Sequence, residues 1–470
     1  MDTNPYDRPE PTSPANANAD QTSDVSGGQE PGNVRLATRL SLFDSTCLIV
    51  GIVVGSGIYE TPALVAKAVD YPWEIFLLWI LGGAISLCGA MCYAELATTY
   101  PESGGDVVYL NRAYGEWAGF LFGWLQTFVA RPGDISLMAL VFAHYVDVLV
   151  DPAAEGDPPI WPAIVIVALL TVVNIAGLRF GKSTQNLLSV VKITGLFAII
   201  GLAFAASGER GVVDVSVTPD GQRPTWGVAL ILILFTYGGW NEMVYVASEV
   251  QQPRRNLWRA LVFGTLAVTS MYLLANAAYL ASLTLPGMAN SGAIATDAVK
   301  PVLPRAGQML VAAVISISAA GAINGLVLTG SRITGAMQKY PAFRWLGHWD
   351  VRLHTPVRAL VLEGLIAITV ISIARTFENA LIYTSAAVYT FYLATSFTTV
   401  ILRQIDPHVE RPFRMPLYPL PLLIFAGGCT CTIWSAFNYD PVAAKVCMTV
   451  ISIGGVVYLL QHRFLRANSA

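Results

Sequence analysis

Long apolar stretches, separated by short polar segments, run through most of the chain. Most of them approach or exceed the ~20 residues that a helix needs to cross the hydrocarbon core of a bilayer. Twelve such stretches can be drawn, at 41–67, 73–98, 115–147, 161–180, 184–207, 226–250, 259–284, 306–336, 355–375, 378–403, 416–438 and 442–464. The third and the eighth are longer than a perpendicular crossing needs, which indicates tilt or extension beyond the hydrocarbon.

The apolar stretches do not alternate apolar and polar residues, as the strands of a membrane barrel do. Backbone N–H and C=O groups in lipid must find partners within the protein, so continuous apolar stretches of this length predict helices. The pattern therefore predicts an all-α membrane protein with 12 transmembrane helices.

Composition excludes several classes of protein. Apolar residues make up 54% of the 470 residues and charged residues 13%, whereas soluble domains carry roughly 25% charged residues. The net charge of −3 offers no basic surface for nucleic acid. The five histidines lack metal-ligand spacing and the six cysteines all lie in apolar stretches, so we expect no metal, no cofactor and no disulfide framework.

The first 36 residues differ from the rest, because they are rich in Pro, Asn, Asp, Ser and Gly and contain few large apolar residues. Such a segment buries too little apolar surface to offset the entropy lost on ordering, so we expect a disordered tail. It has no basic region followed by an apolar one, and so is not typical of a signal peptide.

Positive charge is distributed unevenly between the two sets of loops. The tails and the loops on the N-terminal side hold about 19 of the 28 Lys and Arg residues, and the opposite loops hold about seven. Positively charged loops usually remain in the cytoplasm. We therefore expect a multi-pass protein of the plasma or inner cell membrane with both termini in the cytoplasm.

The first apolar stretch contains helix-weakening residues near its middle. Gly51, Gly55, Ser56 and Gly57 lie close together, and Pro62 follows. Each glycine costs about 1 kcal/mol in a helix interior, so the cluster predicts local unwinding. The alternative is close helix packing, since Gly51 and Gly55 also have GxxxG spacing.

The sixth stretch has a matching cluster, formed by Thr236, Gly238, Gly239 and Asn241. An unwound turn at membrane depth is tolerated where it is buried in protein or lines a cavity. The two interrupted stretches are five apart, an odd number, so the second copy of a five-helix unit would enter the membrane from the other side. This layout predicts an inverted repeat with a binding site at the midplane.

The two breaks suit groups of opposite charge. A half-helix N-terminus after the first break offers N–H groups and a positive dipole end to a carboxylate. Free carbonyls and a half-helix C-terminus in the sixth stretch suit an ammonium group. A pocket with both ends fits the zwitterion of an α-amino acid.

These patterns divide the chain into four regions. We expect a disordered cytoplasmic tail at 1–36, a first inverted repeat with helices 1 to 5 at 37–207, a second with helices 6 to 10 at 208–403, and two peripheral helices with the C-terminus at 404–470.

Several sequence runs resemble one known family. The run GIVVGSGIYETP at 51–62 resembles the first helix of the amino acid–polyamine–organocation superfamily. Further runs are similar, in order and spacing, to the L-type amino acid transporters of that superfamily: 93–96 with 103–109, 131–132 with 139–143, 235–241 with 249–253, 324, 331–332 and 355–357. The resemblance covers about residues 38–465 and implies the leucine-transporter-like fold, with two inverted repeats of five helices and helices 1 and 6 unwound at the midplane.

The resemblance also implies a substrate site at the two breaks. Val53, Ser56 and Gly57 match positions that hold the substrate carboxylate and neighbouring groups, and the glycine cluster adds Gly55.

In the sixth helix the resemblance implies that Phe235, Thr236 and Gly238 line the amine side, with Phe235 as an aromatic gate. Trp240 and Asn241 would shape the side-chain pocket.

This chain departs from the L-type pattern at three places. Thr236 stands where the pattern has a small residue, and Glu242 where it has an uncharged one, so the side-chain preference stays open. The loop at 151–159 lacks the cysteine that tethers a single-pass partner subunit in animal members. The chain thus resembles a bacterial-type member, and we expect no disulfide-linked partner.

Lys192 lies within the fifth apolar stretch, where a lysine costs about 2.5–3.5 kcal/mol on insertion scales. Its side chain could extend to the near interface. Alternatively, its ammonium could stand near the unwound first helix. Many sodium-independent relatives have a lysine here, where sodium-coupled relatives hold an ion, so the resemblance implies sodium-independent transport.

Other ionisable residues are candidates for gating. Glu95 and Asp106 are expected in a cytoplasmic gate. Glu242 could face the substrate side chain or pair with a structural donor. Arg131, beside Pro132, is expected to neutralise a carboxylate or to bond carbonyls that the proline frees.

The sequence thus predicts a secondary active amino acid transporter, an exchanger or a facilitator, which works by alternating access. We expect it to be sodium-independent and to favour neutral L-amino acids. The alternative is a proton-coupled symporter of cationic amino acids or polyamines, which Glu242 and a proton-exchanging Lys192 would favour. An enzyme is not predicted, because the apolar stretches contain no converging set of catalytic groups.

Overall fold

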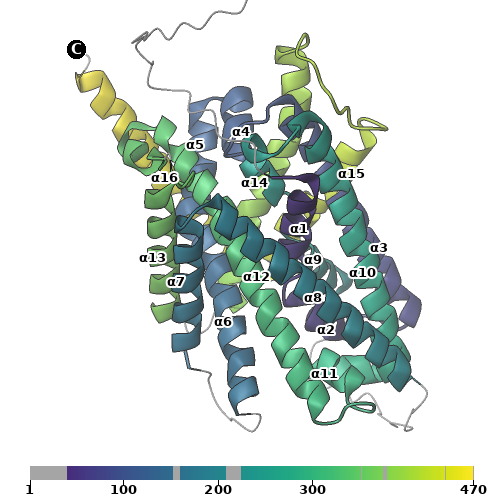
Figure 1. The fold of residues 1–470 in the computed structure, drawn as a ribbon. Helices are drawn as coiled ribbons and strands as arrows, with labels where there is room; N and C mark the ends of the chain where they lie inside the picture. Colours follow the sequence, from purple (N-terminus) through teal and green to yellow (C-terminus); the bar gives the residue numbers. More distant parts are fainter. Residues whose placement is uncertain are drawn as a thin grey trace, which may run out of the picture. The chain divides into compact units, whose positions relative to one another are not determined.

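The computed structural model describes residues 40–151, 159–207, 224–350, 352–373, 378–439 and 441–468. The expected N-terminal tail and nearly all of the cysteine-free loop at 151–159 lie outside these residues. The regular elements of the described chain are helices, accompanied by two isolated β-bridges (Figure 1).

The helices follow the predicted apolar stretches closely. They are α1 (Leu42–Val53), η1 (Gly57–Tyr59), α2 (Thr61–Lys67), α3 (Pro72–Thr99), α4 (Asp106–Tyr114), α5 (Glu116–Leu125), η2 (Gln126–Ala130), α6 (Arg131–Val150), α7 (Trp161–Ile175), α8 (Leu178–Ala206), α9 (Trp226–Thr236), η3 (Glu242–Glu249), α10 (Pro253–Asn290), α11 (Ile294–Val299), α12 (Ala306–Ala336), η4 (Met337–Lys339), η5 (Pro341–Gly347), α13 (Val357–Ile373), α14 (Glu378–Ile405), α15 (Leu420–Tyr439) and α16 (Pro441–Asn468).

Six helices or runs of helices in the described chain are long and apolar enough to cross a membrane. They are Pro72–Thr99, Glu116–Val150, Leu178–Ala206, Pro253–Asn290, Ala306–Lys339 and Leu420–Asn438. Shorter apolar helices, among them Trp161–Ile175 and Cys447–His462, accompany them.

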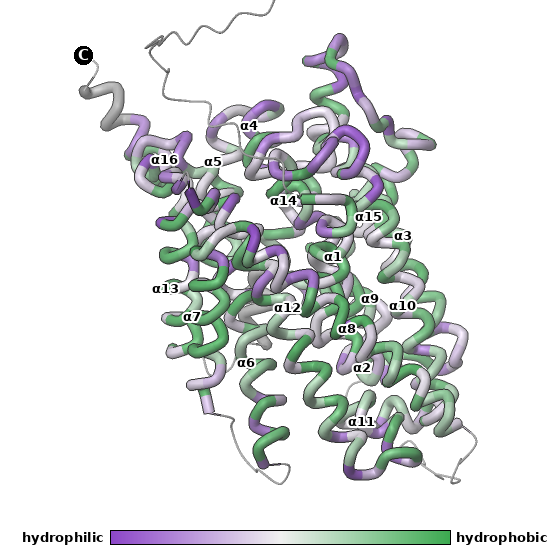
Figure 2. The backbone as a smooth tube through the Cα atoms, viewed as in Figure 1, coloured by the Kyte–Doolittle hydropathy of each residue, from purple (hydrophilic) through white to green (hydrophobic). Residues whose placement is uncertain are grey.

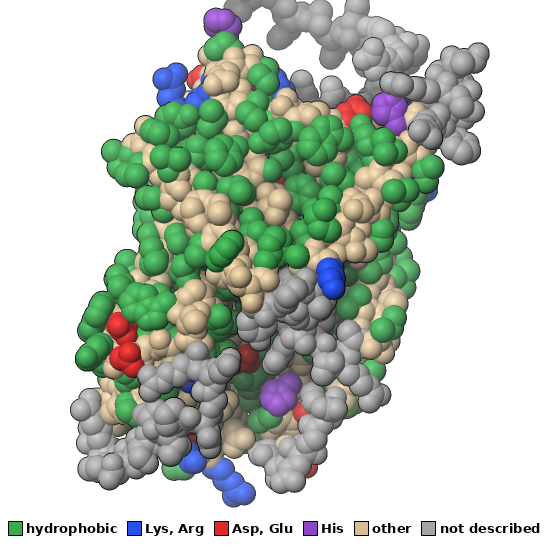
Figure 3. Space-filling model, turned by 180° about the vertical axis from the view of Figure 1, so that it is seen from behind, with side chains coloured by type: hydrophobic (Ala, Val, Ile, Leu, Met, Phe, Trp, Pro, Cys, Tyr) green, Lys and Arg blue, Asp and Glu red, His purple; other side chains and the backbone are tan. Residues whose placement is uncertain are grey.

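The surface of these helices suits lipid. In Figure 2 hydrophobic residues follow the long helices, and hydrophilic residues gather in the connection between α14 and α15. Figure 3 shows hydrophobic side chains across the middle of one face. Leu169 on α7, Leu365 on α13 and Leu459 on α16 are each more than half exposed. Such a surface would be costly in water.

Local sequence fixes where α1 begins. The Ser41 hydroxyl accepts a hydrogen bond from the Asp44 N–H (3.1 Å), and Asp44 accepts one from the Ser41 N–H (2.9 Å). This reciprocal pair satisfies two amide groups that the first turn of a helix leaves free. Lys182 of α8 bonds the same carboxylate (3.0 Å), so the start of α1 is also tied to α8.

α1 and α12 lie at the centre of the bundle. α1 packs against α8, α10 and α12, while α12 packs against α6, α7 and α8 (Figure 1). Every residue from 318 to 337 is buried. Small residues fill this part of α12, which allows neighbouring helices to approach closely. α15 packs on α3 and α14, and α16 on α5 and α14.

Three of the predicted stretches contain a 3-10 or π-helical segment within the described chain. In the first stretch, α1 ends at Val53 and α2 begins at Thr61, with the 3-10 turn η1 between them. In the sixth, α9 ends at Thr236 and the 3-10 segment η3 begins at Glu242. In the third, the π-helical segment η2 separates α5 from α6, and no residue pattern predicted it. Segments of this kind often occur at functional sites.

Candidate functional site

A cavity of about 130 Å³ lies where these three irregular segments meet. Its wall is formed by α1, the turn before η1, η2, α6, α9, the turn before η3, α12 and α14. The lining residues are Ile52, Val53, Gly55, Ser56, Gly57, Gln126, Ala130, Arg131, Asp134, Leu137, Met138, Phe235, Thr236, Gly238, Gly239, Glu242, Ala322, Leu326, Val388, Tyr389 and Tyr392.

The cavity brings together most of the residues that the sequence singled out. They come from two segments that are far apart in the sequence. The members of the lining are Val53, Gly55, Ser56 and Gly57 from the first apolar stretch, and Phe235, Thr236 and Gly238 from the sixth.

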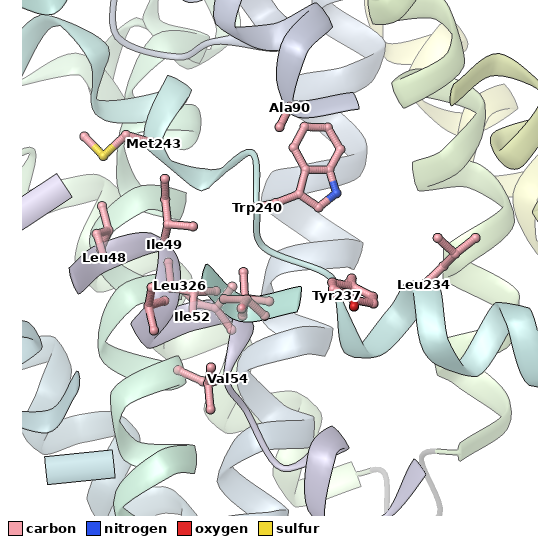
Figure 4. Close-up of a cluster of buried hydrophobic side chains, with 14 of the residues drawn as sticks. Leu48, Ile49, Ile52, Val54, Ala90, Leu234, Tyr237, Trp240, Met243 and Leu326 are labelled. Atoms are coloured by element: carbon pink, nitrogen blue, oxygen red, sulfur yellow. The ribbon is translucent and has the colours of Figure 1, made fainter. Parts of the chain in front are cut away.

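Trp240 and Asn241 lie behind the cavity wall instead. The Trp240 ring packs edge-on against Tyr93 (5.1 Å) and Phe425 (5.5 Å), and Figure 4 shows it directed towards Ala90 of α3. The amide of Asn241, which is fully buried, donates a hydrogen bond to the Tyr245 hydroxyl (3.0 Å). Neither side chain contributes to the cavity lining.

Two glycines allow the interrupted segments to touch. A Cβ atom on Gly57 would lie 2.8 Å from the Thr236 side chain. Gly239 has φ +100°, and a Cβ there would lie 2.6 Å from Ile52. A side chain at either position would push the two segments apart, and at Gly239 it would also strain the backbone.

Tyr272 of α10 forms hydrogen bonds with the ends of both α1 and α9. Its hydroxyl lies 2.7 Å from the Val53 carbonyl oxygen and 3.1 Å from that of Thr236. These are carbonyls at the ends of α1 and α9, where the helix offers them few partners. The sequence pattern did not point to Tyr272, since a tyrosine in an apolar stretch carries no distinguishing signal.

Lys192 reaches the end of α1 and not the membrane interface. Its side chain is fully buried, and its ammonium donates hydrogen bonds to the carbonyl oxygens of Gly51 (2.5 Å), Val54 (2.9 Å) and Ser318 (2.9 Å). The Ser318 hydroxyl also donates to Val54 (2.8 Å). The lysine thus bonds carbonyls at the break in the first apolar stretch.

Glu242 forms the centre of a buried polar network beside the cavity. Arg131 donates to one carboxylate oxygen (2.6 Å) and Thr329 to the other (2.5 Å). The Arg131 guanidinium also lies over the Tyr245 ring, 5.2 Å from its centroid. Arg131 therefore neutralises a carboxylate, and Glu242 both pairs with a donor and borders the cavity.

A further acid in the cavity wall, Asp134, was not among the predicted site residues. It lies one helical turn after Arg131 on α6. A signal was available, since an aspartate within the third apolar stretch is as unusual there as the arginine before it.

Glu95 and Asp106 lie away from the cavity. Glu95 accepts two hydrogen bonds from the Arg403 guanidinium (2.7 and 2.6 Å) and one from the Met415 N–H (2.8 Å). Asp106 accepts a hydrogen bond from the Tyr93 hydroxyl (2.5 Å). These contacts tie α3 to α14 and to α4.

A second buried ion pair, which the sequence pattern did not indicate, joins α12 to η3. Arg332 of α12 forms two hydrogen bonds with the Glu249 carboxylate (2.9 and 3.2 Å), and both side chains are almost fully buried.

Sequence comparison finds relatives of this chain among known proteins. Residues 40–457 match the sequence model of the amino acid permease family. The chain is 31% identical to the b(0,+)-type amino acid transporter 1 of Rattus norvegicus over 428 residues, which cover 88% of this chain and 85% of the relative. It is 30% identical to the large neutral amino acids transporter small subunit 2 of Homo sapiens over 454 residues, which cover 93% of this chain and 83% of the relative.

Proposed function

This chain belongs to the amino acid permease family, and on that basis we propose that it is a secondary active transporter that carries L-amino acids by alternating access. The family match confirms the resemblance seen in the sequence, and it makes the chain a multi-pass membrane transporter and not an enzyme. We further propose that it favours neutral amino acids and works as an exchanger or a facilitator.

The proposed substrate site rests on one observation: the interruptions in the first and sixth apolar stretches line the same cavity. The turn at Gly55, Ser56 and Gly57 forms one part of its wall. Backbone N–H groups at a helix start are suitable partners for the substrate carboxylate. The end of α9 at Phe235 and Thr236 forms another part, where helix carbonyls suit the ammonium group.

The rest of the wall suits an apolar substrate side chain. Leu137, Met138, Leu326 and Val388 line the cavity from α6, α12 and α14. Phe235 acts as the aromatic gate in this proposal. Trp240 and Asn241 shape the pocket indirectly, since Trp240 lies 6.1 Å, between ring centroids, from Tyr392, which lines the cavity.

We place these elements in a leucine-transporter-like fold with 12 transmembrane helices. The repeats are 37–207 and 208–403, with the chain from 404 to 470 at the periphery and both termini in the cytoplasm. The interruptions in the first and sixth stretches and the packing of α15 and α16 against α3, α5 and α14 support this arrangement.

Lys192 takes the role of a coupling ion in this mechanism. Its ammonium bonds three carbonyls around the end of α1, which is where a bound cation would otherwise organise free carbonyls. A fixed positive charge at this point removes the need for Na⁺, and so supports sodium-independent transport. Glu95, Asp106 and Glu242 link helices that must separate on one side during alternating access, which supports a role in gating.

The chain acts without a disulfide-linked partner subunit in this proposal. The loop at 151–159 contains no cysteine, and five of the six cysteines of the chain are buried. The purified chain alone should therefore support transport.

Counterflow into proteoliposomes tests the proposal. The purified chain should exchange labelled neutral L-amino acids for internal amino acid, with equal rates in Na⁺ and in choline. A strict Na⁺ requirement would refute the role of Lys192. Accumulation driven by a pH gradient without internal amino acid would favour the proton symporter instead, and absence of counterflow for every amino acid tested would overturn amino acid transport.

The Ser56→Trp variant tests the proposed substrate site. Ser56 lines the cavity and is almost fully buried, so an indole there should fill the space meant for substrate and abolish counterflow. Phe197→Trp on α8, whose side chain is exposed at the helix surface, should leave counterflow unchanged. Undiminished transport by a correctly inserted Ser56→Trp variant would refute the site assignment.

A further inference from the structure

The cavity wall carries more negative than positive charge. Among the residues that the structure describes, three charged side chains line it: Arg131 and Asp134 from α6 and Glu242 from the start of η3. One guanidinium thus faces two carboxylates. In an enclosure with apolar walls an unbalanced charge is costly, so the second carboxyl group must either take up a proton or gain a positive partner.

Glu242 is already satisfied by the protein. One of its oxygens accepts from Arg131 and the other from Thr329. Its charge is balanced by the guanidinium, and neither oxygen needs a further ligand.

Asp134 is not satisfied in this way. The described residues give its carboxylate neither an ion pair within 4 Å nor a hydrogen bond, although the Arg131 side chain begins one turn away on the same helix. Two other buried cations of the region have partners of their own. Lys192 bonds carbonyls at the end of α1 and on α12, and Arg332 pairs with Glu249. Asp134 therefore faces the cavity with its charge uncompensated by a contact.

The titratable groups around Asp134 include no second cation among the residues that the structure describes. Tyr389 and Tyr392 of α14 line the same cavity, and Glu242 borders it from η3. Glu363 of α13 lies behind Arg131 at Gly330, and neither of its carboxylate oxygens has a hydrogen-bond partner within the described chain. These groups add negative or neutral surroundings and do not neutralise Asp134.

The position of Asp134 along α6 matches a long substrate side chain. Met138, one turn further on, lies beside Gly55, since a Cβ on Gly55 would be 3.7 Å from the Met138 sulfur. Gly55 belongs to the turn where we place the substrate carboxylate. Four residues of helix span about 6 Å, so a side chain with three or four methylene groups could run past Leu137 and bring its charged end to Asp134.

We propose that Asp134 is a specificity-determining residue, which binds the ammonium or guanidinium group of a cationic amino acid side chain, so that the cavity accepts lysine- and arginine-like substrates besides neutral ones. This inference rests on the proposed function, because it uses the same cavity and the same placement of the substrate backbone. In this proposal the charged end of the substrate side chain binds to α6. Glu242 has a different role, since it pairs with Arg131.

The test measures labelled lysine and labelled leucine in parallel counterflow into proteoliposomes with the full chain. The wild-type chain should exchange both. Asp134→Asn, which keeps the shape and removes the charge, should lower lysine exchange by about tenfold or more. It should raise the KM for lysine, leave leucine exchange within about twofold, and be partly rescued in Asp134→Glu.

Asp147→Asn is the control variant, since Asp147 lies on the same helix and does not line the cavity. It should leave both substrates unaffected. Thermal unfolding of each variant in detergent separates loss of function from loss of fold.

The outcomes distinguish this inference from the function on which it rests. If the wild-type chain exchanges leucine and not lysine, the role of Asp134 is wrong and amino acid transport stands. Equal loss of both substrates in Asp134→Asn at unchanged stability, or no loss of lysine exchange, would also overturn it. Leucine uptake that depends on pH in the wild type and not in Asp134→Asn, without lysine exchange, would assign the position to a proton instead. Absence of exchange for every amino acid would remove the proposed function as well.

Discussion

Lys192 of α8 places a positive charge at the end of α1. The Lys192 ammonium holds three carbonyl oxygens that belong to Gly51, Val54 and Ser318. Buried carbonyls without a partner are costly, and each lost hydrogen bond leaves a polar group desolvated. The lysine is thus a structural cation at the point where the first apolar stretch is interrupted.

Removing this cation should stop transport. Lys192→Met keeps much of the side-chain length and loses the ammonium, so the three carbonyls lose their donor and α1 should shift at the cavity. We expect amino acid counterflow to fall at least about tenfold. Lys300→Met, at an exposed residue that follows α11, is the control. Counterflow near the wild-type rate in Lys192→Met would contradict this role.

Gly239 has an equally local role. Its φ of +100° lies in the region that glycine favours, and a Cβ there would meet Ile52 of α1 at 2.6 Å. The residue therefore permits both the turn before η3 and its contact with α1.

Gly239→Ala should separate the two segments and lower counterflow at least about tenfold, with a loss of stability of about 1–3 kcal/mol from the strained backbone. Gly201→Ala on α8 is the matched control, because a Cβ there would meet no atom within 4 Å. Equal counterflow and equal unfolding temperatures in the two variants would refute the close contact as a requirement.

Whole elements differ in how far the sequence predicts them. The ends of α3 and α12 agree with the apolar pattern to within a few residues, because each is a continuous apolar helix with polar flanks. The π-helical segment η2 lies inside an equally apolar stretch, and the apolar pattern does not mark it. This segment directly precedes Arg131 and sets the direction of α6, so the sequence pattern did not predict this part of the site.

The contact between α3 and α4 depends on a buried carboxyl group. Asp106 begins α4, outside the membrane-spanning helices, and accepts a hydrogen bond from Tyr93 of α3. Burial raises the pKa of the Asp106 carboxyl from 3.8 to about 6, although the hydrogen bond from Tyr93 opposes the shift.

This pKa predicts how stability depends on pH. Because the folded state favours the protonated carboxyl, its contribution to stability is fully present below pH 3.8 and is lost as the pH rises through about 6. Asp106→Asn cannot ionise, and its Oδ1 can still accept from Tyr93. The variant should lose less stability than the wild type between about pH 5 and pH 7.5, as measured by thermal unfolding in detergent. Parallel pH profiles for wild type and variant would contradict the assignment, and Asp147→Asn controls for loss of an aspartate elsewhere.

The whole molecule has an orientation that the charge distribution predicts. His408 lies in the connection between α14 and α15, on the side expected in the cytoplasm, and Gly292 lies between α11 and the end of α10, on the opposite side. Both residues are exposed. Five of the six native cysteines are buried, and Cys431 is exposed.

Cysteine labelling can test this orientation. In a Cys431→Ser background, a membrane-impermeant maleimide added to intact cells should label Gly292→Cys and not His408→Cys. Permeabilised cells should give label at both positions. Labelling of His408→Cys in intact cells would place the termini outside and contradict the charge-based orientation.

The class of protein and the course of its helices follow from short-range features of the sequence. Helix length, apolar composition and glycine clusters are properties of neighbouring residues, and backbone hydrogen bonds in lipid leave few alternatives. The residue pattern, together with the family resemblance, was therefore enough to place a set of residues from two distant stretches around one cavity. They are Val53, Ser56, Gly57, Phe235, Thr236 and Gly238.

The tertiary structure decides which polar and charged side chains come into contact. Tyr272 reaches two helix ends, Arg131 pairs with Glu242, and Asp134 remains free of an ion pair within the described chain. Trp240 likewise packs against Tyr93 of α3 and does not line the cavity. Such pairings depend on the rotation and spacing of helices that are distant in the sequence, and no local pattern records them.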